Sequence, residues 1–369
     1  IRVCRVKKME MMLLEECCEI LDSMRIPITA SNRKEGIYPY YGANGIQDHV
    51  ADYIFDDELV LLAEDGGNFG SKTRPIAYRV SGKCWVNNHA HVLKPKEGLN
   101  VDFLCYSLMF YNTEGLVNGA TRQKLTQTTM RKMLIPNLSI ENQLYIVNQL
   151  NKLLKIIELR KKEIQQLDNL TKARFVEMFG DPVANDKGWK MKPLLDMGKC
   201  KNGMNFHYDD SGVEISCLGV GDFKDLSVID NTKKLSIVSL NEMPSEEYLL
   251  KDGDIVFVRS NGNKDLVGRS LAIYPGKLPT TFSGFCIRYR IHDDEITVPY
   301  LLRVLKMESM RKKMAGRGAN IQNLNQQILG TLVIPVPPIE LQNQFVDFVR
   351  AIDKSKVAVQ KALDETQIL

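Results

Sequence analysis

The chain has 369 residues, which is more than one hydrophobic core usually serves, so we expect at least two domains. Hydrophobic and charged residues make up 44% and 25% of the chain, and these fractions exclude a disordered or fibrous protein. The net charge is only +4. Any surface for a polyanion must therefore come from local clustering of basic residues.

The cysteines and the hydropathy pattern indicate where the protein works. Eight cysteines are present without a Cys-x-x-Cys pair, and adjacent Cys17 and Cys18 cannot easily bridge each other, so we expect reduced thiols. No apolar run approaches the roughly 18 to 20 residues of a membrane span. The first five residues are too polar for a signal peptide. These features predict a cytoplasmic protein without a membrane partner.

In chain order, the first half starts with short β-type runs that Gly, Asn, Asp and Pro interrupt, such as residues 57–63 and 84–86. A helical pattern follows over residues 101–111. Next come a loop rich in Gly, Gln and Asn and a short apolar strand that ends at Pro136. A long helix is then predicted over Ile140–Phe179, with a length of about 60 Å if it is continuous.

The second half shows the same succession of elements. Its β-type runs include residues 255–258 and 285–289, and a helical pattern covers residues 300–314. A strand closing on Pro335, Pro337 and Pro338 precedes a final helix over residues 340–367, which would be about 42 Å long.

An internal repeat explains this parallel order. Many residues of the first half return after the same interval of 199 positions. The repeated residues are Gly119-Ala120, Gln123, Leu125, Gln127, Ile135-Pro136, Ile140-Glu141 and Gln143, which return as Gly318-Ala319, Gln322, Leu324, Gln326, Ile334-Pro335, Ile339-Glu340 and Gln342. Weaker matches pair residues 59–62 with 255–258 and residues 101–104 with 298–301. The period is far longer than a solenoid repeat and indicates a duplicated domain with pseudo-twofold symmetry.

Both long helices carry an apolar stripe that advances by threes and fours, which is typical of a coiled coil. Lys161 interrupts the first stripe and Lys356 the second. The predicted seam residues are Val147, Leu150, Leu154, Ile157 and Ile164 in the first helix, and Phe345, Val349, Ile352, Val359 and Leu363 in the second. Each stripe needs a partner, and the two helices most simply pack on each other. The alternative is that each helix lies on its own domain.

The order of these features resembles the specificity subunit of type I restriction-modification enzymes. The resemblance starts near Leu14 and covers nearly the whole remaining chain. The phrases that carry it are GIYPYYGANG at 36–45, EDG at 64–66, FGDP at 179–182, LKDGDI at 250–255, IPVPP at 334–338, and the Gly-containing loop, Ile-Pro and Ile-Glu-x-Gln elements that occur twice.

The resemblance implies an α+β architecture with two similar mixed α/β target-recognition domains. Two long antiparallel helices that form a coiled coil would separate them. The expected boundaries are residues 1–139 for the first recognition domain, 140–185 for the first helix and a linker, 186–338 for the second recognition domain and 339–369 for the second helix.

The resemblance also implies what such a chain does. Each recognition domain reads one half of a bipartite double-stranded DNA target, and the helices dock two methyltransferase (modification) subunits, which restriction subunits join. The chain itself is not an enzyme and binds no cofactor, because S-adenosylmethionine belongs to the modification subunits, and ATP and Mg²⁺ to the restriction subunits. Since the two domains differ in sequence, we expect an asymmetric target.

The helices would also set the spacing between the two half-sites. Each helical residue adds about 1.5 Å to the rod, whereas each base pair adds about 3.4 Å to the DNA. The length of the DNA spacer should therefore follow the length of the helices.

Base-reading residues are expected in loops that differ between the two halves. The candidates are Arg33, Lys34, Tyr41, Asn44, Asn68, Lys72 and Arg74 in the first half, and Asn205, His207, Arg259, Asn261, Asn263, Lys264 and Arg269 in the second. The alternative for any one of them, especially a turn Asn, is a role in backbone geometry.

Clusters of basic residues supply candidates for phosphate contacts. Residues 303–317 hold six cations against the single acid Glu308. The predicted phosphate contacts are Arg122, Lys124, Arg311, Lys312, Lys313 and Arg317. The alternative is a solvated helix face. The Gln- and Asn-rich loops 119–129 and 318–327 recur in both halves, so they should serve the scaffold or the phosphates rather than distinguish bases.

Catalytic and metal-binding motifs are weak. The chain has no GxxxxGK[ST] loop, no Asp/Asn-Pro-Pro-aromatic methyltransferase motif, and no helix predicted after the glycines 219 and 221 to cradle a dinucleotide. His89 and His91 would share a strand face without an evident third ligand, so we interpret them as a packed or surface pair. Glu64 and Asp65 beside Lys72 are better explained by a turn at a strand end than by a nuclease site.

Three other functions stay open at this point. A nuclease or methyltransferase with an unrecognised motif would modify or cut DNA by itself. A coiled-coil interaction scaffold would bind no DNA. The chain could also be the specificity domain of a related methyltransferase-nuclease system.

Overall fold

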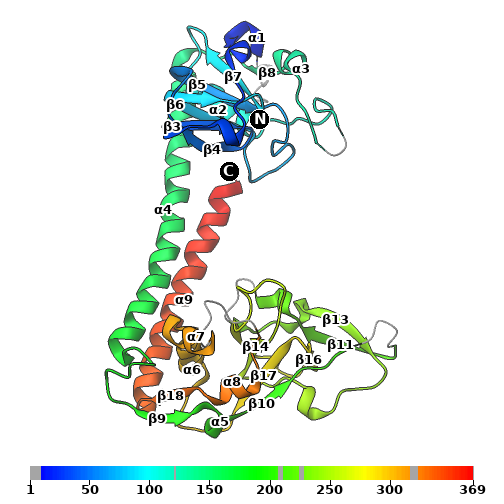
Figure 1. Cartoon of the computed structure of the whole chain (residues 1–369), viewed down its shortest axis with the longest axis vertical. Helices are drawn as coiled ribbons and strands as arrows, with labels where there is room; N and C mark the ends of the chain where they lie inside the picture. Colours follow the sequence, from blue (N-terminus) through cyan, green and yellow to red (C-terminus); the bar gives the residue numbers. More distant parts are fainter. Residues whose placement is uncertain (1–9, 120–121, 207–210, 224–227, 316–322, 369) are drawn as a thin grey trace, which may run out of the picture. The chain divides into compact units, whose positions relative to one another are not determined.

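The computed structural model describes all residues except 1–9, 120–121, 207–210, 224–227, 316–322 and 369 (Figure 1). The chain divides into two compact units, Ile1–Glu158 and Leu159–Leu369. Each unit holds one of the two expected recognition domains together with part of the helical regions. His207 and Arg317, two of the candidate DNA contacts, lie outside the described residues.

A six-stranded sheet in the order β2-β7-β5-β6-β3-β4 organises the first unit. Its pairs are antiparallel except β3 with β6, which is parallel. The strands are β2 (Cys18–Ile20), β3 (Glu35–Gly42), β4 (Gly45–Val50), β5 (Phe55–Ala63), β6 (Ala77–Val86) and β7 (Ala90–Pro95).

Strand β5 lies at the centre of this unit because its apolar run is buried on both faces. Val60 and Leu62 join the core with Phe103 and Leu104 of helix α2 (Val101–Met109), while Leu61 packs in a second cluster on the opposite face. Asn100 caps α2 by accepting hydrogen bonds from two backbone N–H groups of its first turn.

The remaining elements of the first unit connect the sheet to the long helix. They are β1 (Met11–Leu13), α1 (Leu14–Cys17), α3 (Gln127–Arg131), β8 (Leu134–Pro136) and the N-terminal part of α4 (Ile140–Phe179), whose residues from Leu159 on belong to the second unit. Strands β1 and β8 pair in an antiparallel ribbon just before α4 begins. Helix α4 starts and ends where its apolar periodicity predicts, and Gly180, in the left-handed conformation with φ 75°, follows its last residue.

The second unit contains a five-stranded sheet in the order β10-β17-β14-β15-β12, a three-stranded sheet β13-β11-β16 and a ribbon of β9 with β18. The strands are β9 (Lys190–Pro193), β10 (Gly198–Asn202), β11 (Val213–Leu218), β12 (Val228–Ile229), β13 (Ser236–Leu240), β14 (Asp254–Val258), β15 (Ser270–Ile273), β16 (Thr280–Phe282), β17 (Cys286–Ile291) and β18 (Val333–Val336). The helices are α5 (Leu194–Met197), α6 (Val298–Lys306), α7 (Glu308–Ala315), α8 (Gln326–Gly330) and α9 (Ile339–Ile368).

The helix expected over residues 300–314 is in fact two helices. Met307 has an extended backbone, with φ −64° and ψ 140°, and separates α6 from α7. The prediction of one continuous helix was therefore wrong at this point. The periodicity of the sequence continues across Met307, so only the backbone conformation reveals the break.

The two units use the same succession of elements, as the internal repeat predicts. In both, a ribbon strand, a one-turn helix and a sheet strand lead to a central strand with antiparallel neighbours, and a ribbon strand then leads into a long helix. Leu14 donates a backbone hydrogen bond to Met133 O, and Leu194 donates the corresponding bond to Leu332 O, both at 2.9 Å. The three-stranded sheet of the second unit has no counterpart among the described strands of the first.

A buried glutamine fixes the start of each long helix and explains the repeated Ile-Glu-x-Gln phrase. Gln143 accepts a hydrogen bond from Asn100 N and donates to the carbonyls of Gly98 and Leu138. Gln342 accepts from Thr297 N and donates to the carbonyls of Glu295 and Pro337. Both side chains are fully buried, so each amide replaces water for three backbone groups at once.

Within the second unit, the C-terminal half of α4 packs antiparallel to α9. Arg160 donates hydrogen bonds to Ala362 O and Thr366, and Lys356 forms an ion pair with Asp168. Further along, the ring centroids of Phe175 and Phe345 lie 5.3 Å apart. Residue numbers rise along one helix as they fall along the other.

The expected seam residues have different environments. On α9, Phe345, Ile352 and Leu363 are buried, and Val349 and Val359 are half-buried. On α4, Leu150, Ile157 and Ile164 are half-buried and Leu154 is exposed. Val147 packs into the core of the first unit, as the alternative interpretation of helices on their own domains predicts for this position.

None of the described helices, including the 40 residues of α4, combines the length and the apolar character that crossing a bilayer requires.

Candidate nucleic-acid interface

Three loops of the first unit meet at one end of its sheet. Asn44, in the turn between β3 and β4, donates a hydrogen bond to Gly66 O at 3.0 Å. Gly66 lies in the loop after β5 and donates its N–H to Gln123 O at 3.2 Å. Leu125 N donates to Glu64 O at 2.7 Å. The structure therefore brings the candidates Asn44, Arg122 and Lys124 to one surface.

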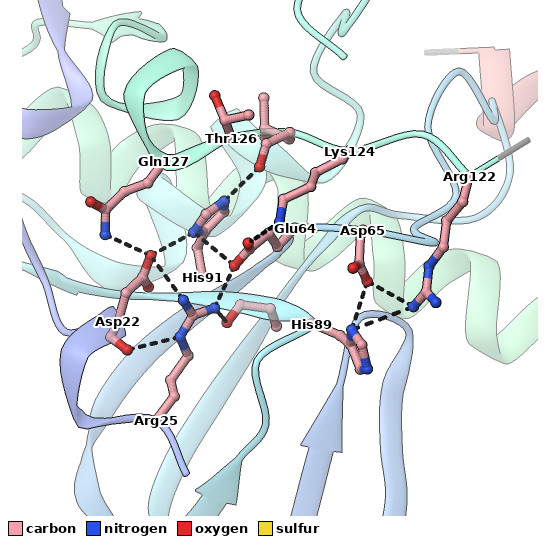
Figure 2. Close-up of polar contacts among 12 residues, drawn as sticks. Asp22, Arg25, Glu64, Asp65, His89, His91, Arg122, Lys124, Thr126 and Gln127 are labelled. Carbon is pink, nitrogen blue, oxygen red and sulfur yellow. Dashed lines mark hydrogen bonds and ion pairs between the residues drawn. The ribbon is translucent and has the colours of Figure 1, made fainter. Parts of the chain in front are cut away.

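A layer of charged and polar side chains lies beneath these loops (Figure 2). Arg25 donates to Glu64 at 2.6 Å, and Lys124 approaches the other oxygen of Glu64 at 3.0 Å. Asp22 accepts a hydrogen bond from Gln127 Nε2 at 2.9 Å. This polar layer, Asp22, Arg25, Glu64, His91, Lys124 and Gln127, ties the segment after β2 and the end of β5 to the loop that begins α3.

A second group of polar contacts lies beside the polar layer. Asp65 Oδ1 is 2.7 Å from His89 Nδ1 and 2.8 Å from Arg122 Nη2 (Figure 2). Asp65 is mostly covered, whereas Arg122 has more than half of its side chain exposed. The Asp65 carboxylate therefore holds one nitrogen of the Arg122 guanidinium, and the rest of that side chain stays open to solvent.

The carboxyl groups of the polar layer are held ionised. Burial opposes ionisation of Asp22, but hydrogen bonds from His91, Val92 N and Gln127 outweigh it and keep the pKa of Asp22 below its usual range. Burial likewise opposes ionisation of Glu64, and hydrogen bonds from Arg25 and Lys124 lower its pKa overall. Both groups are therefore anionic at neutral pH.

Asp22, Glu64 and His91 place ligand atoms within 4.8 Å of one another, which is close enough for one metal ion. Asp22 and Glu64 are the groups that join His91, whereas His89 contacts Asp65 and is not part of this cluster. The donors are already engaged, because both nitrogens of His91 have hydrogen-bond partners and a guanidinium and an ammonium group contact Glu64. The donor set therefore fits an internal ionic network better than a metal site.

The histidines and acids flagged in the sequence thus have structural partners. His91 is fully buried on Asp22, and His89 is half-buried on Asp65. Glu64 and Asp65 directly follow β5, at the strand end, while Lys72 is exposed in the loop beyond.

Three more candidates lie in the loop between β5 and β6. Lys72 and Arg74 are exposed, and the backbone N–H of Arg74 donates to Ser71 Oγ at 2.9 Å. Asn68 Nδ2 lies 3.4 Å from Pro75 O, a contact that closes the loop on itself. Lys72 and Arg74 have the accessibility that a base-reading residue needs.

Arg33, Lys34 and Tyr41 belong to or precede β3. Arg33 pairs with Asp48 at 3.2 Å and lies 4.2 Å above the ring of Tyr40, so its guanidinium is committed to the sheet. Tyr41 is half-buried with its ring 5.7 Å from that of Tyr78. Lys34 is exposed.

In the second unit the corresponding loop after β14 carries most of the candidates. Asn261 accepts a hydrogen bond from Asn263 N, and Asn263 accepts one from Asp265 N, so both amides shape turns. Arg269 donates to the carbonyl of Asp265. Arg259 is half-buried and its carbonyl accepts from Leu324 N, while Lys264 and, on a separate loop, Asn205 are exposed.

The basic cluster of residues 303–315 is partly internal. Arg311 donates to the carbonyls of Gly268 and Val267 and holds the loop before β15, and burial lowers the pKa of its guanidinium. Lys312 pairs with Glu308 at 2.6 Å on the exposed face of α7, next to exposed Lys313. Among these cations, only Lys312 and Lys313 are fully presented to solvent.

The repeated loop serves the scaffold in both units. Gln127 Nε2 donates to Asp22, and Gln326 Nε2 donates to Asn202 at 3.2 Å. Each glutamine is the first residue of a short helix and reaches the segment where the first sheet strand ends. The sequence repeat marked both glutamines, whereas Asp22, Arg25 and Asn202 carried no signal.

Two copies of a mixed α/β domain, each followed by a long helix and differing from the other in the loops at one strand end, define a class of duplicated two-domain proteins. The family profile described as "Type I restriction modification DNA specificity domain" matches residues 6–169 and 186–366. The chain belongs to this family, and it is a type I restriction-modification specificity subunit.

Two curated relatives illustrate the match. A putative type I restriction enzyme specificity subunit of Haemophilus influenzae is 30% identical over 346 residues, which are 90% of this chain and 84% of that protein. The type I restriction enzyme StySPI specificity subunit of Salmonella potsdam is 23% identical over 313 residues, which are 78% of this chain and 66% of that protein.

Solved structures agree on the fold. The type I restriction-modification S subunit from M. genitalium superposes with a TM-score of 0.54 at 15% identity, over 100% of this chain and 95% of that one. A chain from a study of complex assembly in a type I system gives a TM-score of 0.60 at 16% identity, over 98% and 95%. The predicted family and its two mixed α/β domains are therefore confirmed.

Proposed function

We propose that each domain of this chain reads one half of a bipartite, asymmetric DNA target. The observation that supports this most directly is the duplication itself: the same succession of ribbon strands, central strand and long helix recurs, while the loops at the strand ends differ. A shared scaffold with different loops is what two different half-sites require. The exposed candidates for base contacts are Lys34, Asn44, Lys72, Arg74, Asn205, Asn263 and Lys264.

The proposed phosphate contacts lie close to these loops. Arg122 and Lys124 are half or more exposed above the carboxylates that hold them. In the second unit, Lys312 and Lys313 project from α7. Phosphate contacts of this kind would position each domain on the duplex, and the loop residues would then select the sequence.

The long helices are proposed to set the DNA spacer and to dock two methyltransferase subunits. Several large apolar side chains on α4 are exposed, and a protein partner would cover them. They are Leu144, Tyr145, Leu154, Ile156, Leu159, Leu170 and Val176. The catalytic groups and cofactors would then belong to the partners, namely S-adenosylmethionine to the modification subunits, and ATP and Mg²⁺ to the restriction subunits. We place the assembly in the cytoplasm, where the DNA is.

Salt-dependent DNA binding tests this proposal. The full chain with its methyltransferase partners should retain duplex DNA, and its affinity should fall with a slope of about 3.6 in log affinity against log salt if four phosphates are neutralised. No retention would favour an interaction scaffold, and retention that does not respond to salt would contradict the proposed phosphate contacts. Methylation or cleavage by the purified chain alone would show that it is an enzyme.

A further inference from the structure

His91 is a fully buried histidine with a hydrogen-bond partner on each ring nitrogen. It lies on β7, with Nδ1 2.6 Å from Asp22 Oδ2 and Nε2 2.9 Å from the carbonyl oxygen of Leu125 (Figure 2). The ring therefore spans the distance between the segment after β2 and the loop that carries Arg122 and Lys124.

Both partners of His91 are acceptors. Leu125 O is a backbone carbonyl, and the carboxylate of Asp22 already accepts hydrogen bonds from Val92 N and Gln127 Nε2, each at 2.9 Å. A neutral imidazole has a single N–H and would leave one of these two acceptors facing a lone pair. The geometry is satisfied only when both ring nitrogens carry a proton.

The surrounding charges are consistent with an imidazolium. Asp22 is in direct contact, and Glu64 lies 3.7 Å from Nδ1. The cations that face the same carboxylates are Arg25, which is bound to Glu64 and lies 3.5 Å from Asp22, and Lys124, which is bound to Glu64. A doubly protonated ring is therefore stabilised by its direct contact with the ionised carboxylate of Asp22.

The loop that His91 holds presents two cations. Leu125 is fully buried and anchors the loop, while its neighbours Lys124 and Arg122 have about half or more of their side chains exposed. His91 contacts the carbonyl oxygen of Leu125, so the contact fixes the backbone of the loop.

We propose that His91 is a positioning residue. Its doubly protonated ring holds Arg122 and Lys124 where they contact DNA phosphates. The proposal rests on the proposed function, because it requires the first unit to bind DNA. The second unit holds its corresponding loop without a charged pair, because Gln326 donates to Asn202, a neutral amide. The backbone contact is shared: Leu324 N donates to Arg259 O as Leu125 N donates to Glu64 O. Among the residues that the structure describes, the charged contact between His91 and Asp22 is therefore a feature of the first unit.

A double-mutant cycle on DNA affinity tests the proposal. The four proteins are the wild type, His91→Gln, the pair Arg122→Gln with Lys124→Gln, and the triple variant, each as full chain in its methyltransferase complex. His91→Gln should lower DNA affinity tenfold or more, and it should reduce the salt slope by up to about 1.8, since each phosphate contact contributes about 0.9. The pair and the triple variant should bind DNA equally, because His91 acts through the two cations.

His49→Gln is the matched control, since His49 is exposed on β4 of the same unit. It should leave both affinity and slope unchanged. A wild-type salt slope in His91→Gln, or a loss that adds to that of the Arg122 and Lys124 substitutions, would overturn the positioning role.

A second measurement uses only the wild-type protein, so its result does not depend on whether the variants fold. The ¹⁵N resonances of selectively labelled histidine at neutral pH should show both nitrogens of His91 protonated. One unprotonated ring nitrogen in His91 would refute the doubly protonated state and with it the proposal. If the wild type showed no salt-dependent DNA binding, the proposed function itself would fail, while the ¹⁵N result would still decide the protonation of His91.

Discussion

Lys306, on α6 of the second unit, is a half-buried cation. It lines a cavity of about 190 Å³ in the second unit, together with Arg303 of the same helix and Phe345 of α9. Burial, and then the nearby charges of Arg303 and Arg269, lower the pKa of Lys306 to about 8 from its ordinary 10.5. Arg303 and Lys306, part of the basic cluster noted in the sequence, are thus partly internal and poorly placed for a phosphate.

This pKa predicts a pH-dependent stability. Below pH 8 both folded and unfolded chains carry the charged lysine, and the folded state bears the full cost of burying it. Between pH 8 and 10.5 only the folded state loses the proton, so the cost is relieved as pH rises. Lys306→Met should therefore raise the Tm by a few degrees at pH 7, and the gain should shrink towards pH 10.

Thermal unfolding of Lys306→Met and wild type at several pH values checks this. Lys313→Met, on the exposed face of α7, should leave the Tm almost unchanged at every pH. A difference between Lys306→Met and wild type that stays constant from pH 7 to 10 would contradict the lowered pKa.

The residues of the polar layer show why the sequence predicted only part of this site. Arg122 and Lys124 were recognised because their charge is visible in the sequence, and the repeat singled out Gln127. Asp22 and His91 are 69 positions apart and meet only because β2 pairs with β7. Such a contact depends on strand order, which no local pattern contains.

Among the elements, the long helices were the most predictable and their partners the least. The apolar period of α4 and α9 extends over 40 and 30 residues, so their ends were predicted within one residue. The period does not say which neighbour covers each position, and Val147 packs on the first unit's core. The break at Met307 and the three-stranded sheet of the second unit likewise escaped, because short strands and single extended residues leave weak patterns.

The pairing of α4 with α9 makes a specific energetic prediction. Lys356 contacts Asp168 on α4, and both side chains are partly exposed. A cycle of Asp168→Asn, Lys356→Gln and the double variant should give a coupling energy of about 0.5–1 kcal/mol, typical of a partly exposed ion pair.

Urea unfolding of the four proteins gives the coupling. The pair Glu308 and Lys312, which lies within α7, provides a comparison that does not involve α9. Zero coupling between positions 168 and 356, with normal coupling between 308 and 312, would mean that the two helices do not pair in this register.

For the whole molecule, the proposed function assigns one half-site to each of the two duplicated domains and the spacer to the long helices. The family and the succession of elements could be predicted from the 199-residue repeat, since it preserves order over a whole domain. The target bases could not be predicted from the sequence, because the candidate loops differ between the two halves. Several amides and guanidinium groups in these loops also serve the fold, as in Arg33 and Asn263.

The most direct test is to lengthen α4 and read the DNA target. Four residues would be inserted close to Lys161, between Leu159 and Arg160. They add about 6 Å of helix and leave the contact of Arg160 with Ala362 in place. Methylated adenines would then be mapped in cells that express the chain with its modification partner. If the helices set the DNA spacer, the half-sites should stay unchanged and the spacer should lengthen by about 1–2 base pairs. An unchanged spacer, or a full target selected by one domain alone, would contradict it.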